Sequence, residues 1–194
     1  MEISNSFTAD VNLFFENPAV YHTPPRRYSV LYLLRRDIST CMGVDPSSGK
    51  PIGFQALFPA AMAVLAGIDL LGKFLAGSDK PREVGSRFRR FIARYFRDIS
   101  PADAEVIYQL RNALLHSFGL YSESKGKVYR FILVIAGKSL VQSLGNDTYL
   151  VDIRVLYDKF ETAIASYRAD LAADGMLQSH FSTMFPKYGV LYIR

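Results

Sequence analysis

Apolar and polar residues alternate along most of this chain with the period of an α-helix. In RRYSVLYLLRRDISTCMGV, the residues Val30, Leu34 and Ile38 recur at intervals of four and share one helical face. A longer apolar run follows from about residue 53 to 76 and closes at Gly77, a residue suited to a left-handed cap. The pattern predicts two helices separated by the turn-rich loop DPSSGKP.

Three further helices are predicted. Residues 82 to 97 form an amphipathic segment, and residues 152 to 173 carry apolar positions along one side. Between them, Ser100-Pro101-Ala102-Asp103 combines a capping serine, a proline suited to the first helical position and an acid in the first turn. We therefore expect a helix from 101 to about 118, with Gly119 as its stop.

The period changes between the last two helices. KVYRFILVIAG is rich in β-branched and aromatic residues and predicts a mostly buried strand. GKSLVQSL and TYLV predict two shorter strands joined by a tight turn at Gly145-Asn146-Asp147. Residues 127–151 are thus expected to form a small antiparallel β-meander inserted before the last long helix.

These elements predict a mainly α fold, in which residues 1–194 form a single domain: a bundle of about five helices that carries the β-meander. Residues 1–26 are expected to be irregular, because two prolines in HTPPRR prevent a continuous helix. Residues 176–194 are expected to form a C-terminal extension, with a short helix and an apolar tail, GVLYIR, that needs a partner surface.

Composition narrows the class of protein. An apolar fraction of 49% with 21% charged residues is that of a folded globular chain. Cys41 is the only cysteine, which excludes an internal disulfide and favours a reducing compartment, and the first residues lack the pattern of a signal peptide. We expect a cytoplasmic protein. Its net charge of +5 and pI near 9.3 favour anionic partners.

The one membrane candidate is the apolar segment from residue 54 to 76, which approaches the roughly 20 residues needed to span a bilayer. Asp69 and Lys73 lie within it and would be costly in lipid, whereas the wet edge of a core helix tolerates them. The sequence therefore predicts a buried core helix and no membrane partner.

Motifs for metal, nucleotide and hydrolase chemistry are missing from the sequence. None of the three histidines, His22, His116 and His180, forms a pair at metal-ligand spacing. No GxxxxGK[ST], GxGxxG or GxSxG segment occurs. We expect neither a metal site nor a cofactor.

The chemically suggestive residues are Arg111, Asn112 and His116, near the end of the helix predicted from 101. The segment RNALLH fits the R-x4-6-H signature and resembles the HEPN domain family. HEPN domains are small helical bundles, commonly dimeric, and many are metal-independent endoribonucleases of toxin–antitoxin, antiphage and RNA-processing systems. Others bind ligands or partners without cutting RNA.

This resemblance implies a catalytic role for each of the three side chains. His116 would act as acid or base, Arg111 would stabilise charge on the phosphorus, and Asn112 would position the substrate. The product would be a 2′,3′-cyclic phosphate. The implied partners are RNA, a second copy of the chain, and an antitoxin or regulatory protein.

Helix geometry complicates this site. At about 100° per residue, Asn112 and His116 are about 40° apart, whereas Arg111 and His116 are about 140° apart. Only the long side chain of Arg111, or a groove completed by a second protomer, would bring its head near His116. We therefore expect a dimer-dependent site.

A row of arginines suggests a surface that could follow an RNA backbone. Arg87, Arg90, Arg94 and Arg97 recur at three, four and three, and Lys125 and Lys127 follow the motif closely enough to contact the same anion. The alternative is a non-catalytic interaction or small-ligand-binding module of a defence or regulatory system. In that case the arginine row is a solvated helix face, Arg111 pairs with a core-side acid and His116 stands alone in water.

Overall fold

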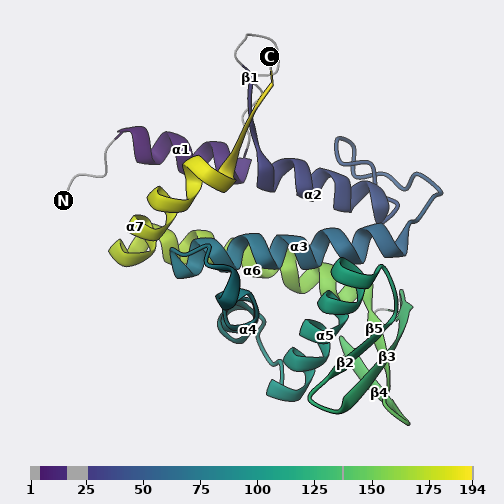
Figure 1. The fold of residues 1–194 in the computed structure, drawn as a ribbon. Coiled ribbons are helices and arrows are strands. Elements are labelled where there is room, and N and C mark those ends of the chain that lie inside the picture. Colours follow the sequence, from purple (N-terminus) through teal and green to yellow (C-terminus); the bar gives the residue numbers. More distant parts are fainter. Residues whose placement is uncertain (1–4, 17–25, 137, 194) are drawn as a thin grey trace.

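In the computed structural model, which describes residues 5–16, 26–136 and 138–193, the long helix α3 (Leu57–Ala76) runs through the middle of the fold (Figure 1). It packs against α2, α4, α5, α6 and α7. Seven α-helices occur in the described residues, so mainly α is correct while the count of about five is too low. The other six are α1 (Asn5–Glu16), α2 (Val30–Cys41), α4 (Val84–Tyr95), α5 (Pro101–Ser117), α6 (Ile153–Ala173) and α7 (Gly175–Met184).

The apolar character of α3 is explained by its neighbours. It is buried on several sides, and it ends at Gly77 with φ +62°, the left-handed cap that the sequence predicts. In the described part of the chain it is the one helix long and apolar enough to cross a membrane by length and composition, and half of its most apolar stretch is buried inside the protein. Such packing is that of a core helix.

Helix α5 begins as predicted but ends differently. The Ser100 hydroxyl accepts a hydrogen bond from the Asp103 amide at 3.0 Å, which caps the first turn. At the other end, the left-handed cap residue is Phe118, with φ +48°, and not Gly119. The chain leaves the helix one residue earlier than the glycine would suggest.

The four strands that follow α5 do not form a meander. They are β2 (Tyr121–Ser124), β3 (Lys127–Val134), β4 (Val141–Gly145) and β5 (Thr148–Asp152), in the spatial order β2-β3-β5-β4. The predicted turn between β4 and β5 is present, with positive φ at Asn146 and Asp147, but β5 pairs with β3 in parallel.

The parallel pairing has a physical reason in the two competing strands. Strand β5 contains Tyr149, Leu150 and Val151 and becomes buried toward its end, whereas β4 is mostly exposed. The more apolar strand therefore takes the central place, and β4 takes the edge. The meander prediction assumed that strands adjacent in sequence also pair in space.

The N-terminal segment is not irregular over its described part, because residues 5–16 form α1. Tertiary packing accounts for this helix: Phe14 is fully buried, and its ring lies 4.7 Å from that of Phe74 and 5.4 Å from that of Phe181. His22 lies outside the described residues.

The apolar C-terminal tail finds its partner within the same chain. After α7 and a short π-helical turn (Phe185–Gly189), strand β6 (Val190–Ile193) pairs antiparallel with β1 (Arg26–Ser29). The two strands form a narrow ribbon that projects from the helices (Figure 1). The extension predicted over 176–194 is thus a helix followed by a paired strand.

Candidate functional site

Arg111 joins the predicted site residues to the core. Its Nη1 lies 2.6 Å from His116 Nε2 and 3.3 Å from the Asn112 side-chain oxygen. Its Nε and Nη2 each lie 2.7 Å from Oδ2 of Asp69 on α3. The three side chains that the motif singled out are therefore in contact within a single chain.

The long side chain of Arg111 solves the geometric difficulty of the helix. Asp69 holds the guanidinium from the α3 side, and Nη1 then extends along α5 toward His116, five residues further on. Of the two arrangements expected from the sequence, reach around the helix is the one observed. A second protomer is not needed to bring Arg111 to His116.

Arg111 is the donor in its contact with His116. A guanidinium has five N–H donors and no acceptor, so Nε2 of His116 must offer its lone pair. His116 is exposed at the end of α5, where a substrate can reach it.

The pair formed by Asp69 and Arg111 is mostly withdrawn from solvent. The side chains are 17% and 11% exposed, respectively. Burial raises the pKa of Asp69 above its ordinary value, and the charge and hydrogen bonds of Arg111 act against that rise. Because removing one partner would leave the other buried without compensation, this pair fixes the guanidinium firmly.

A row of polar side chains continues from this pair along α5. Gln109 donates to Glu105 at 2.7 Å, and its own side-chain oxygen accepts from Ser122 on β2 at 2.8 Å and from Asn112 at 3.5 Å. Residues 105, 109, 112 and 116 are spaced by four, three and four, so they share one face of the helix. A row of polar side chains therefore runs from His116 to Glu105, and its middle member, Gln109, is buried.

At the Glu105 end, this row reaches a cavity of about 480 Å³ between α4, α5 and the β2–β3 hairpin. It is lined by Arg89, Glu105, Ser124, Lys125, Lys127 and Tyr129. Arg89 donates to Glu105 at 2.6 and 3.2 Å, which balances one of the three positive charges. The cavity keeps an excess of positive charge.

The two predicted lysines line this cavity, and Lys127 lies beside two aromatic rings. Lys127 Nζ is 5.0 Å from the centre of the Tyr129 ring and 5.7 Å from that of Tyr149, and the two rings are stacked. A hydrogen bond with Tyr149 and the neighbouring phenols raises the pKa of Lys127. Lys127 therefore places an ammonium, charged at neutral pH, at the wall of the cavity.

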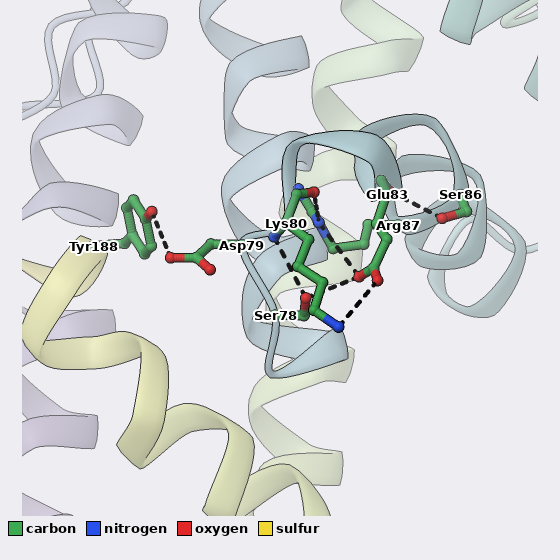
Figure 2. A network of polar contacts seen from close by, with 7 residues as sticks. All are labelled: Ser78, Asp79, Lys80, Glu83, Ser86, Arg87 and Tyr188. Carbon is green, nitrogen blue, oxygen red and sulfur yellow. Dashed lines mark hydrogen bonds and ion pairs between the residues drawn. The ribbon is translucent and has the colours of Figure 1, made fainter.

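The sequence predicted Arg87 as part of an exposed arginine row on the helix over 82–97, and for this residue the prediction is wrong. This side chain is only 4% exposed, donates to the Lys80 carbonyl at 2.7 Å and lies 3.7 Å from Glu83 (Figure 2). Arg94 is exposed but pairs with Asp170 at 2.7 Å. The buried face of α4 includes Arg87, and Arg97 lies beyond the end of the helix at Tyr95, so the predicted row does not form one open surface.

The other two members of that row, Arg90 and Arg97, are exposed. Neither lines the cavity that holds Lys125 and Lys127. The α4 residue that does is Arg89, which the spacing of the row passed over. Its position depends on the approach of Glu105 from α5, which no local pattern reveals.

The sequence did hold one signal for Asp69. A carboxylate in the middle of an apolar helix requires a partner, and Arg111 is a cation at the edge of an apolar stripe. Matching them across 42 residues would have needed the packing of α3 on α5. Within the described residues, no group of three or more His, Cys, Asp and Glu side chains converges as a metal site would require.

Comparison of the chain with protein-family models, with curated proteins and with solved structures gave no match.

Proposed function

We propose that this protein is a HEPN-like RNA-binding protein and a metal-independent endoribonuclease. The observation that carries the proposal is the 2.6 Å contact between Arg111 and His116, with the guanidinium anchored by Asp69. It joins an exposed imidazole to a positioned positive charge, the two groups that RNA transesterification needs.

In the proposed reaction, His116 acts as the base. A phosphate oxygen of the substrate accepts the hydrogen bond that Arg111 Nη1 otherwise donates to His116. The lone pair on Nε2 of His116 then becomes free. The imidazole then removes the proton of the ribose 2′-hydroxyl, the 2′-oxygen forms its bond to phosphorus, and the bond to the 5′-oxygen breaks. Solvent water protonates the 5′-oxygen, and the imidazolium returns its proton to solvent.

Arg111 stabilises the charge that develops on the phosphoryl oxygens, because Asp69 holds the guanidinium in place before the substrate arrives. Asn112 contacts Arg111 and Gln109, so it fits the role of a positioning residue. The products are a 2′,3′-cyclic phosphate and a 5′-hydroxyl end.

The cationic cavity supports the binding of an RNA strand next to this pair. Lys125, Lys127 and Arg89 surround it, and the row from Glu105 to Asn112 joins it to Arg111. Phosphates of a single strand would neutralise the excess charge there. We include in the proposal a cytoplasmic location, a homodimer and control by an antitoxin or another regulatory protein.

The test is cleavage of a fluorescent single-stranded RNA by the purified protein in the presence of EDTA. We expect cleavage with a chelator, cyclic phosphate ends, and a loss of about 10²- to 10⁴-fold in rate in His116→Ala. His180→Ala is the matched control, because that ring bonds the Leu75 carbonyl far along α3 and should leave the rate unchanged.

Two results would overturn parts of the proposal. A protein that neither binds nor cleaves RNA rules out the function as a whole. Cleavage that survives His116→Ala unchanged rules out the assigned site. Arg111→Lys adds a finer test. Lysine keeps the charge, but a single ammonium cannot bond Asp69 and His116 in the way that the planar guanidinium does, so the cleavage rate should fall by about 10-fold or more.

A second candidate is a non-catalytic binding module, for which the core-side pair of Arg111 with Asp69 is the supporting observation. A separate cavity of about 230 Å³, lined by residues of α2 and α6 that include Arg35 and Glu161, would then serve a small ligand. Absence of RNA cleavage, together with binding of a small ligand that is lost in Glu161→Ala, would favour this candidate.

A further inference from the structure

Phe118 has a backbone conformation that its side chain does not favour. It ends α5 with φ +48°, in the left-handed region where a Cβ is crowded. The other non-glycine residues with positive φ in the described chain are Asp98, Lys125, Asn146 and Asp147, all polar. Gly119, which would adopt this conformation without strain, lies one position later.

The ring of Phe118 is also not used to fill the core. It is 70% exposed, and the aromatic ring beside it is that of Phe58 on α3, with centroids 6.2 Å apart and planes inclined by 39°. A strained backbone and an exposed apolar ring both cost free energy, and core packing does not account for either. Their combination indicates a role in binding.

The surroundings of Phe118 suggest what it binds. It follows His116 by two residues, at the end of the helix that carries Arg111. An arginine and a histidine can hold a phosphate and a ribose, but they leave the adjacent base without a partner. A flat, exposed aromatic ring is the side chain that stacks on a base of unpaired RNA.

We propose that Phe118 is a stacking platform for a nucleobase next to the phosphate bound by Arg111 and His116. The inference rests on the proposed function and adds to it a substrate class: unpaired, base-bearing RNA, with little preference among bases, since every base has a π face. Phe58 on α3 contacts one side of the ring and leaves most of it exposed to a base.

A single substitution separates this role from a structural one. Glycine suits φ +48°, so Phe118→Gly should leave the melting temperature unchanged or raise it. The same change removes the platform, so affinity for RNA should fall by about 5- to 100-fold. A merely structural residue would not give higher stability together with weaker binding.

The experiment measures anisotropy of a short single-stranded RNA with 2′-O-methyl riboses, which prevent cleavage, and of the matching abasic oligomer. We expect the wild-type protein and Phe118→Trp to prefer the base-bearing strand and Phe118→Gly to lose that preference. Tyr192→Ala, which removes a similarly exposed ring (63%) from the projecting β6, is the control and should bind like the wild type.

The outcomes distinguish this inference from the proposed function. If the wild type binds RNA and Phe118→Gly binds it equally well with the same preference, the platform is wrong while the proposed function stands. If the wild type binds no RNA, both are overturned. If Phe118→Gly changes only the oligomeric state in light scattering, Phe118 belongs to a protein interface and the inference is again wrong.

Discussion

Arg111 and Asp69 meet at 2.7 Å, from both Nε and Nη2 of the guanidinium to one carboxylate oxygen, so α5 is tied to the middle of α3 by a pair that solvent barely reaches. The pair fixes the guanidinium in the orientation that brings Nη1 to His116. Structure and proposed chemistry therefore depend on the same carboxylate.

Asp69→Asn should lower both stability and activity. The Arg111 side chain is only 11% exposed, so removing the charge of its counterion should cost about 3–5 kcal/mol in the free energy of unfolding. Urea denaturation measures this change in the free energy of unfolding. Asp37→Asn is the control: its pair with Arg36 is exposed, so the change should cost less than about 0.5 kcal/mol. Equal costs for the two variants would contradict the anchoring role of Asp69.

Lys127→Ala should weaken RNA binding through charge alone. Losing one phosphate contact should reduce the slope of log K against log salt by about 0.7 for a single strand. Titrations at several salt concentrations measure the slope. Lys187→Ala removes the same charge from a residue paired with Asp79 and should leave the slope unchanged. If Lys127→Ala leaves the slope unaltered, the cavity does not bind the RNA backbone.

Gly67→Ala tests the closeness of α3 and α6. An added Cβ would lie 2.4 Å from Phe160 Cζ and 2.9 Å from a methyl of Leu34. Although alanine favours a helix, the overlap should cost about 1–3 kcal/mol in unfolding free energy. Gly175→Ala, with nothing within 4 Å of the new Cβ, should be neutral or mildly stabilising. A stabilised Gly67→Ala protein would refute this packing.

Cys41 should react slowly with iodoacetamide at neutral pH. Burial, and then the charge of Asp37, raise the pKa of its thiol above the ordinary value. The thiolate is therefore scarce at neutral pH, and the rate should keep rising as the pH passes that ordinary value.

Asp37→Asn should speed this alkylation by roughly 2-fold, since it removes a negative charge near the thiol. Asp158→Asn, on α6, is the control, because it makes the same charge change and Asp158 does not act on the pKa of Cys41. If both variants react at the same rate, Asp37 does not act on Cys41.

The features that sequence predicted well are those set by neighbouring residues. The Ser100 cap, the left-handed Gly77 and the turn at Asn146-Asp147 each depend on a few adjacent positions, and each is present. The shared face of Asn112 and His116 follows from helical spacing in the same way.

The features that the sequence did not reveal depend on distant parts of the chain. Helix α1 is held by Phe14 packing on Phe74 and Phe181, and Arg87 is buried because α4 turns that side toward the core. The link from Arg111 to Asp69 likewise joins two helices. Residue types at these positions were compatible with several packings, and only the assembled core selects one.

The order of elements along the chain has a consequence for synthesis. Asp69, Arg89, Arg111, His116 and the β2–β3 hairpin all come from one uninterrupted stretch, α3 through β3. The parallel ladder with β5, by contrast, must wait for a later hairpin and the closure of a longer loop. A ribosome therefore delivers Asp69, Arg111, His116 and the walls of the cationic cavity before β5, α6 and α7, which complete the core around them.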